Sequence, residues 1–231
     1  MGADKKKYAV IVAGGTGSRL GGGLPKQFRN LNGMPVIWWS MKAFKDSDSA
    51  TEIILVVHPD YIKEWNDLHL SLPEESRIPH KVVGGGGSRT ESVVNGIAEI
   101  DDPDDALIAV HDAARPLVPL DLIRRGWEAG EKFGAAVPAI PVTDSLRRIT
   151  EAGSVAVDRA EYLAVQTPQV FRSSVLKGAY GSMPGKIFTD DASATEAAGW
   201  TTAIFEGSPE NMKVTNPGDL EIASLRLSSR G

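Results

Sequence analysis

Residues 8–27 read Y-A-V-I-V-A-G-G-T-G-S-R-L-G-G-G-L-P-K-Q, and this stretch decides the fold. The apolar run at 8–12 predicts a buried strand. Six glycines then fall within ten positions, and the loop holds Arg19 and Lys26 but no acidic residue. Glycines let main-chain amides approach an anion closely, and the two cations neutralise its charge. The stretch therefore predicts a strand that ends in a polyphosphate-binding loop.

Two common nucleotide loops are excluded by their spacing. A dinucleotide-binding loop reads G-x-G-x-x-G, but Leu20 stands where the third glycine would be. A Walker A loop needs Gly-Lys followed by Ser or Thr, and the pair Gly185-Lys186 is followed by Ile187. A plain surface loop is the alternative, and the cations inside the loop favour a phosphate site over it.

Composition bounds the class of protein. The chain has 231 residues, 42% of them hydrophobic and 24% charged, which is typical of a globular protein with a core of its own. The net charge of −5 argues against a nucleic-acid-binding protein. There is no cysteine, no apolar run long enough to span a membrane and no apolar leader before residue 8. We expect a cytoplasmic protein with neither membrane nor nucleic acid as a partner.

Strand-like and helix-like segments alternate along the chain. Strands are predicted at 8–12, 52–57, 80–83, 106–110, 134–140 and 202–206, and helices at 34–45, 59–69, 88–99, 119–132, 172–182, 190–198 and 217–228. A capping box at 88–91 and Asn216 before Pro217 mark two helix starts. Alternation of this kind predicts one α/β domain over residues 1–231, with a Rossmann-like, mostly parallel sheet covered by helices on both faces.

Residues 144–166 interrupt this alternation. Two short runs of alternating polarity flank the turn signal E-A-G-S at 151–154, which predicts a β-hairpin arm projecting from the sheet. A lone hairpin is only marginally stable. We therefore expect the arm to pack on another surface, and a second copy of the chain is the simplest choice.

Asp112 is the first candidate for chemistry outside the glycine loop. It follows the apolar run 106–110 within the sequence H-D-A-A-R-P. A carboxylate at the carboxyl end of a buried strand suits Mg²⁺, which proteins usually hold with one or two carboxylates plus substrate phosphates. The alternative is a turn aspartate that caps the next element. For His111 we predict a structural role in packing or hydrogen bonding.

A second glycine run, at 84–87, leads into the predicted helix 88–99. Its main chain could contact a nucleobase together with Ser92, although a loose turn is an equal alternative. The segments 167–169, 189–191 and 211–213 each stand at an element boundary and, on composition alone, favour structural roles. Lys213 is nevertheless a candidate to meet the first loop in space.

Six segments in this order resemble the 2-C-methyl-D-erythritol 4-phosphate cytidylyltransferase family. They are A-G-G-T-G-S-R-L-G-G-G-L-P-K-Q-F, H-D-A-A-R-P, V-D-R, Q-T-P-Q-V-F, T-D-D-A-S and N-M-K-V-T. The resemblance as a whole covers about residues 8–225. The first segment alone indicates only the wider nucleotidyltransferase superfamily, and the later ones are more specific. The resemblance implies a nucleotidyltransferase fold, a homodimer with swapped arms, and transfer of a cytidylyl group from CTP to methylerythritol 4-phosphate with release of pyrophosphate in non-mevalonate isoprenoid synthesis.

The resemblance also implies roles for individual residues. Arg19 and Lys26 match cations that stabilise the transition state, Asp112 matches a Mg²⁺ ligand, and Arg159 and Lys213 match residues that position the attacking phosphate. Further matches to contacts with the alditol phosphate are Arg115, Ser145, Thr167 and Thr189. Matches to CTP-binding positions are Ala13, Gly14, Gly15, Thr16, Gly17, Gly87 and Ser92. Because Ser145 and Arg159 lie on the predicted arm, they would serve the active site of the partner.

Two positions depart from the family pattern, and three rival functions stay open. Ser145 stands where members often have Thr, and Gly87 where some have Asp. One rival is a cytidylyltransferase for another alditol phosphate, such as ribitol 5-phosphate, against which the two alanines of H-D-A-A-R-P argue. A sugar-1-phosphate nucleotidyltransferase is less compatible with the arm and the length. An inactive nucleotide-binding regulatory domain is disfavoured because Arg19, Lys26, Asp112 and Lys213 occur together.

Overall fold

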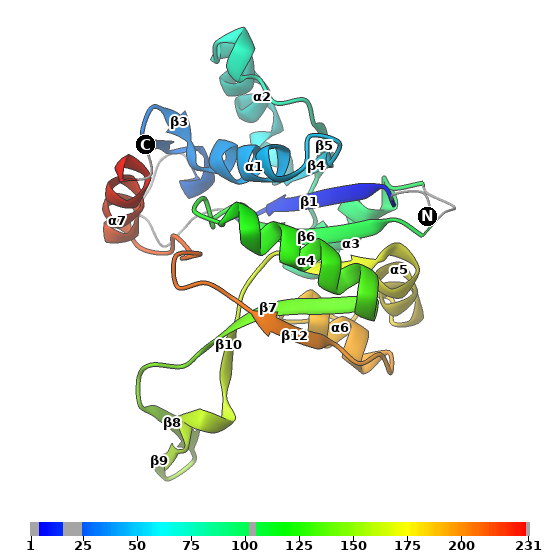
Figure 1. Cartoon of the computed structure of the whole chain (residues 1–231), viewed down its shortest axis with the longest axis vertical. Helices are drawn as coiled ribbons and strands as arrows, with labels where there is room; N and C mark the ends of the chain where they lie inside the picture. Colours follow the sequence, from blue (N-terminus) through cyan, green and yellow to red (C-terminus); the bar gives the residue numbers. More distant parts are fainter. Residues whose placement is uncertain (1–4, 16–24, 102–104, 230–231) are drawn as a thin grey trace.

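The computed structural model describes residues 5–15, 25–101 and 105–229. A twisted sheet runs through the centre of the molecule, with helices in front of it and behind it (Figure 1). Within the described residues the sheet has eight strands. Seven follow the order β10-β7-β11-β6-β1-β4-β5, and the eighth, β12, also pairs with β7. Its strands are β1 (Lys7–Ala13), β4 (Glu52–Val57), β5 (Lys81–Gly84), β6 (Leu107–Asp112), β7 (Ala135–Pro141), β10 (Leu163–Val165), β11 (Gln169–Arg172) and β12 (Ala203–Glu206).

Strand β1 lies near the middle of the sheet and is parallel to both of its neighbours, β4 and β6. Register places Val12 beside Val56 on one side and beside Asp112 on the other. Strand β11 is antiparallel to both β6 and β7, so the sheet is mostly but not wholly parallel. The predicted α/β class is confirmed, with the carboxyl ends of β1 and β6 at the same edge.

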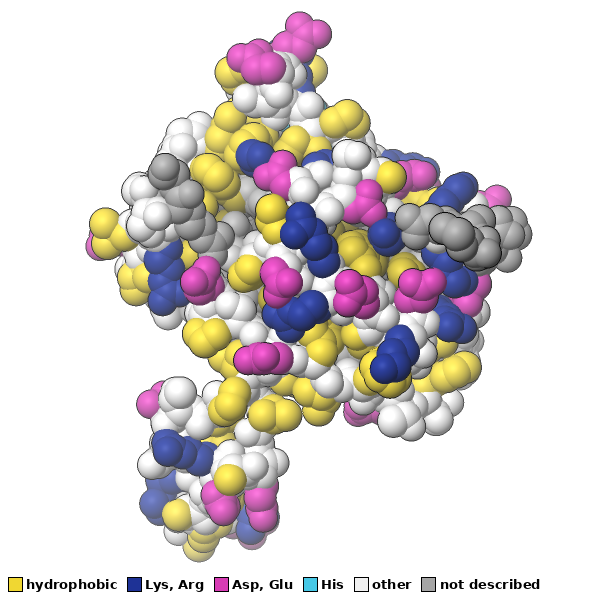
Figure 2. Space-filling model, in the orientation of Figure 1, with side chains coloured by type: hydrophobic (Ala, Val, Ile, Leu, Met, Phe, Trp, Pro, Cys, Tyr) yellow, Lys and Arg dark blue, Asp and Glu magenta, His cyan; other side chains and the backbone are white. Residues whose placement is uncertain are grey.

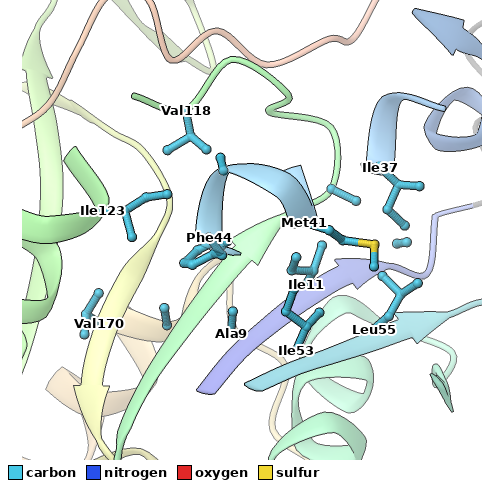
Figure 3. Close-up of a cluster of buried hydrophobic side chains, with 14 of the residues drawn as sticks. Ala9, Ile11, Ile37, Met41, Phe44, Ile53, Leu55, Val118, Ile123 and Val170 are labelled. Carbon is cyan, nitrogen blue, oxygen red and sulfur yellow. The ribbon is translucent and has the colours of Figure 1, made fainter. Parts of the chain in front are cut away.

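Helices cover both faces because successive residues of β1 point to opposite sides. The helices of the described residues are α1 (Val36–Ser47), α2 (Ile62–Ser71), α3 (Arg89–Ala98), α4 (Leu120–Phe133), α5 (Ser173–Ser182), α6 (Asp191–Ala197) and α7 (Pro217–Ser228). Ala9 and Ile11 pack with α1 and α4, as Figure 3 shows around Phe44 and Met41. Tyr8 and Val10 belong to the opposite cluster, with α3 and α5.

Several element boundaries differ from the sequence-based prediction. The predicted helix at 34–45 begins two residues later, because 30–31 and 34–35 form the short hairpin β2 (Asn30–Leu31) and β3 (Met34–Pro35). Strand β11 was not predicted: it has only four residues, directly after Pro168 and before α5, and so offers no periodicity. The remaining short turns are η2 (Lys26–Phe28), η3 (Pro59–Tyr61), η4 (Glu74–Ser76) and η5 (Arg159–Glu161).

The two predicted helix starts have different outcomes. Asn216 caps α7 as predicted, in a capping box with Asp219. Ser88 caps α3 by accepting a hydrogen bond from the Glu91 amide at 3.1 Å, but the box is not completed. The Glu91 carboxylate instead accepts a hydrogen bond from the amide of Gly87, at 2.6 Å. The prediction of a full capping box at 88–91 was therefore wrong, because the second glycine loop takes the carboxylate.

The predicted hairpin is present as β8 (Leu146–Thr150) paired with β9 (Gly153–Val157). It projects from the body of the molecule below β7 and β10 (Figure 1), and Figure 2 shows it as a separate lobe. The last residues of the predicted arm return to the central sheet as β10, antiparallel to β7. Large apolar side chains of this region are exposed, with Ile149 at 87%. Among the described residues, no helix is long and apolar enough to cross a membrane.

Candidate active site

A cavity of about 550 Å³ opens at the carboxyl ends of β1 and β6. After β1 the chain continues to β4 and β5 on one side, and only then crosses to β6 on the other side. Ligands of open α/β sheets bind in the crevice at such a point of divergence. The cavity is lined by Val12, Gly14, Gly15, Lys26, Gln27, His58, Gly87, Ser88, Arg89, Ser92, Asp112, Ala113, Ala114 and Lys213.

A buried glutamine fixes the start of the first glycine loop. The Gln27 amide donates hydrogen bonds to the carbonyl oxygens of Ala13 at 2.8 Å and Gly15 at 3.0 Å. In a trans peptide the carbonyl and the following N–H point in opposite directions. The N–H of Gly14 is therefore turned away from Gln27, and the loop leaves β1 in a defined orientation.

Ser92 joins the two glycine loops. Its hydroxyl donates to the carbonyl of Ser88 at 2.9 Å and accepts from the amide of Gly86 at 3.1 Å. A Cβ atom added at Gly14 or at Gly85 would lie 2.9 Å from this same hydroxyl oxygen. The close approach of the two loops therefore requires glycine on both sides of Ser92.

Asp112 stands at the end of β6 with three cations around its carboxylate. Lys213 Nζ lies 2.7 Å from Oδ2, Arg89 Nε lies 3.6 Å from Oδ1, and Arg115 Nε lies 3.9 Å from Oδ2. Burial raises the pKa of Asp112, but Lys213 and then Arg89 outweigh this and hold the pKa well below its usual range. Asp112 is therefore ionised throughout the physiological pH range.

Lys26 and Lys213 reach this cavity from opposite ends of the chain. Lys26 begins the short turn η2, and its Nζ donates a hydrogen bond to the carbonyl of Val214 at 2.8 Å. Val214 is fully buried and anchors the segment that carries Lys213. The predicted meeting of Lys213 with the first loop in space is thus confirmed for the described part of that loop.

A buried hydrogen-bond network holds the main chain of Asp112 in place. The Asp112 amide donates to the Thr167 hydroxyl at 3.1 Å, and that hydroxyl lies 3.2 Å from His111 Nδ1. The other ring nitrogen of His111 lies 3.2 Å from the carbonyl of Arg115. Asn211 closes the network by donating to the Thr167 carbonyl and accepting from Arg115. His111 is fully buried, and burial lowers its pKa to about 4, so the imidazole is neutral and structural, as predicted.

Seven residues that the sequence singled out line one cavity, although they come from distant parts of the chain. They are Gly14, Gly15, Lys26, Gly87, Ser92, Asp112 and Lys213. Ala13, directly before the loop, is buried at the end of β1. Thr16, Gly17 and Arg19 lie outside the described residues.

Five other residues assigned by the resemblance do not line this cavity. Thr167 is buried, and its hydroxyl accepts a hydrogen bond from the Asp112 amide. Arg115 donates a guanidinium hydrogen bond to the Asn211 carbonyl. Thr189 is exposed just before α6. Ser145 and Arg159 are exposed on the arm, where Arg159 donates to the Thr143 carbonyl. Composition and spacing could not separate residues that support the site from those that line it.

Four polar cavity residues were not assigned from the sequence. Gln27 and Ser88 were quoted there only as part of motifs, and His58, directly after the predicted strand 52–57, was not named. Arg89 was named only within the predicted capping box. Each follows a glycine loop or a strand end, which is the signal that could have identified it.

The residues present fit a divalent cation that arrives with a polyphosphate. Asp112 Oδ2 accepts a hydrogen bond from Lys213, whereas within the described residues Oδ1 has only the ion pair with Arg89. One ionised carboxylate facing a cavity supplies what Mg²⁺ takes from protein when phosphates provide its other ligands. In the parts of the chain that the structure describes, no cluster of three or more metal-binding side chains occurs, so phosphate oxygens would be needed.

Comparison with known proteins shows the family of this chain. The family model described as IspD, 2-C-methyl-D-erythritol 4-phosphate cytidylyltransferase, matches residues 8–229. Proteins of that name from Bacteroides thetaiotaomicron and Porphyromonas gingivalis are 44% and 42% identical to this chain. The first alignment covers 96% of this chain and the second 98%, and both cover 100% of the relative.

Solved structures of proteins with this or a similar name share the fold of this chain. The enzyme of that name from Thermus thermophilus superposes with a TM-score of 0.75 at 29% identity, over 96% of this chain and 99% of that one. A structure described as 4-diphosphocytidyl-2C-methyl-D-erythritol synthase gives a TM-score of 0.79 at 28% identity, over 97% and 100%. The match over nearly the whole chain places this protein in the 2-C-methyl-D-erythritol 4-phosphate cytidylyltransferase family.

Proposed function

We propose that this protein transfers a cytidylyl group from CTP to 2-C-methyl-D-erythritol 4-phosphate, giving CDP-methylerythritol and pyrophosphate for isoprenoid synthesis. A phosphate oxygen of the sugar phosphate forms a bond to the α-phosphorus of CTP, and the bond from that phosphorus to the β-bridging oxygen breaks. Family membership supports this reaction. The observation that carries it is the convergence of Lys26, Asp112 and Lys213 on the cavity beside the first glycine loop. A cytoplasmic location belongs to the same proposal.

Charge repulsion between two polyanions is the main barrier that this site would lower. At about 4 Å, two unit charges repel by roughly 4 kcal/mol at an effective dielectric of 20. Lys26 and Lys213 offset this repulsion and stabilise the charge that develops at the α-phosphate, which is catalysis by positioning and electrostatics. Arg19 would act with them.

The attacking group needs no general base in the protein. A phosphate monoester has a second pKa of about 6 and is therefore mostly a dianion at neutral pH. His111, the imidazole next to Asp112 in sequence, is buried and neutral and takes its place in the supporting network instead. The role of the protein is to hold two anions in line rather than to move a proton.

The two glycine loops would divide the recognition of CTP between them. The triphosphate would lie along Gly14 and Gly15, with Thr16 and Gly17 continuing the contact. The cytosine would lie near Gly87 and Ser92 on the other side of the cavity. Gly87 has no side chain for the base, so recognition there would use the main chain.

Mg²⁺ completes the proposal as the expected cofactor. Asp112 would hold it, and the ion would neutralise triphosphate charge and polarise the α-phosphate when bound. The surrounding cations keep Asp112 ionised and ready to bind.

A homodimer formed through the arm is a further part of the proposal. Ile149, Val155 and Tyr162 expose 87%, 41% and 42% of their surface, and burying them against a second copy would stabilise a hairpin that is weak by itself. Ser145 and Arg159 would then contact the sugar phosphate bound to the partner. Thr189, Arg115 and Thr167 would complete the binding site for the sugar phosphate.

Pyrophosphate release tests the proposed function directly. The purified protein would be incubated with Mg²⁺, one of the four ribonucleoside triphosphates, and either methylerythritol 4-phosphate or ribitol 5-phosphate. We expect turnover only with CTP and methylerythritol 4-phosphate. Preferred turnover of ribitol 5-phosphate would assign a different alditol substrate, and CTP binding without turnover of any acceptor would indicate an inactive nucleotide-binding domain.

A further inference from the structure

Arg89 is the first residue of α3 and lies between two carboxylates from different elements. Its Nη2 is 2.6 Å from Asp191 Oδ2, and its Nε is 3.6 Å from Asp112 Oδ1. Its Nη1 is buried and has no hydrogen-bond partner among the described residues. An arginine that served Asp191 alone would gain most from a bidentate contact through two nitrogens. The observed guanidinium is instead shared between the two carboxylates.

Asp191 holds this guanidinium in place from the side away from the cavity. The Asp191 side chain is 0% exposed, and its Oδ1 accepts a hydrogen bond from the Tyr180 hydroxyl at 2.7 Å. The Asp191 amide donates to the Gln169 side chain, which ties the start of α6 to β11. Burial lowers the pKa of Arg89, but Asp191 and Asp112 more than offset this, so the guanidinium stays charged. Arg89 is therefore anchored by the core.

Neither of the other two cations around Asp112 is anchored to the carboxylate in the way that Arg89 is held by Asp191. The Lys213 side chain is 42% exposed, and in the proposed reaction its ammonium contacts the attacking phosphate. Arg115 is 3.9 Å from the carboxylate and donates to the Asn211 carbonyl. When Lys213 turns to a substrate, Arg89 remains as the anchored cation beside Oδ1 of Asp112.

We propose that Arg89 is a positioning residue that keeps the Asp112 carboxylate oriented for a divalent cation while Lys213 moves to substrate. This inference rests on the proposed function, because it takes Asp112 as the cation ligand. Residues that orient a metal ligand without touching the metal typically change metal affinity by about 10- to 100-fold when they are replaced. Arg89 connects that orientation to the buried core through Asp191.

Removal of Arg89 alone would leave Asp191 buried and unpaired, which could unfold the protein. The informative variant is therefore R89Q combined with D191N. The five charged groups here are three cations and two carboxylates, with a net charge of +1. The double variant removes one of each, so that net charge stays at +1, and it breaks only the link from the core to Asp112.

The measurement is CTP binding by calorimetry on the full chain, with Mg²⁺ and with EDTA, alongside the melting temperature. For the double variant we expect near-normal melting, an unchanged affinity with EDTA, and a loss of about tenfold or more in the affinity with Mg²⁺. D191N alone is the control, and it should keep most of the difference in CTP affinity between Mg²⁺ and EDTA. In a D112N background the double variant should add no further loss, because Arg89 acts through Asp112.

The possible failures are distinguishable. If the wild-type chain binds CTP equally well with Mg²⁺ and with EDTA, the assignment of a cation to Asp112 is wrong and the role of Arg89 falls with it. If the wild type responds to Mg²⁺ and the double variant responds within twofold of it, Arg89 only neutralises Asp191, and the positioning role is overturned while the proposed function stands. An additional loss in the D112N background would likewise show that Arg89 acts on CTP directly.

Discussion

The side chain of Lys26 donates a hydrogen bond to the main-chain carbonyl of Val214, at 2.8 Å and across 188 residues of sequence. This contact ties the turn after the first glycine loop to the segment that carries Lys213. Lys213 in turn pairs with Asp112 at the end of β6. One lysine thus connects an early and a late segment of the chain at the cavity. Its replacement should lower turnover more than it lowers stability.

Replacement of Lys26 by Ala should lower kcat by about two orders of magnitude or more, by analogy with the loss of a transition-state donor. Steady-state pyrophosphate release measures this. K63A is the matched control, since Lys63 is an exposed helix lysine that pairs with Asp67 at the surface. Near-normal turnover by a folded K26A protein would show that Lys26 is not catalytic.

Replacement of Ile149 by Asp should weaken the dimer, because this side chain is 87% exposed on the arm and apolar burial would be lost. Light scattering coupled to size-exclusion chromatography measures the mass as a function of concentration. L70D is the control, since Leu70 is 62% exposed at the end of α2, in the body of the molecule. Equal dimerisation of I149D and wild type would argue against an arm-mediated interface.

Arg159 should act on the partner's substrate, so R159A should raise the KM for the sugar phosphate more than the KM for CTP. Mixed dimers test the sharing. In a heterodimer of an R159A chain and a K26A chain, one site would combine an intact Lys26 with an intact Arg159 from the other chain. We expect roughly half of the wild-type activity per dimer. A purified heterodimer with almost no activity would mean that Arg159 serves its own chain.

Gly96 lets α3 approach the sheet closely. A Cβ atom there would lie 2.7 Å from Val10 Cγ1 and 2.8 Å from Val56 Cγ2, so G96A should destabilise the protein by about 1–3 kcal/mol. Gly178 lies in α5, where an added Cβ would meet no described atom within 4 Å apart from its chain neighbours and its own helix backbone. G178A should therefore stabilise by about 0.5–1 kcal/mol, because alanine is the better helix former. Urea unfolding measures both, and an equal change in the two variants would contradict the packing argument.

Stability should fall with acid through His111. Burial lowers its folded pKa to about 4, below the ordinary value of 6.5, so the unfolded state binds more protons between these values. The contribution of neutral His111 to the free energy of unfolding is complete above about pH 6.5. It is lost as the pH falls toward 4, and the loss is up to about 3 kcal/mol. H111N should flatten this part of the curve of unfolding free energy against pH. An unchanged slope would assign the titration to other groups, such as His69 and His80, whose pKa values are also lowered.

Local patterns in the sequence were enough for the class of fold and for much of the site. The glycine run after residues 8–12, the four glycines at 84–87 and the aspartate after 106–110 each follow a strand, and parallel strands bring such ends to one edge. The arm was also predictable from its alternation around a turn. These features depend on residues close together in the chain, where backbone preference and polarity act directly.

The tertiary structure decided what lies between those local features. Strand β11 exists because two neighbouring strands supply its hydrogen bonds, since four residues carry no periodicity of their own. Thr167 turned out to support Asp112 from behind, and Arg89 was found to bridge Asp112 and Asp191. The contact from Thr167 to Asp112 joins groups 55 residues apart, and the one from Arg89 to Asp191 spans 102 residues, so only packing fixes their distances. Sequence thus determined which groups reach the sheet edge, and folding decided which of them face the cavity and which hold the others in place.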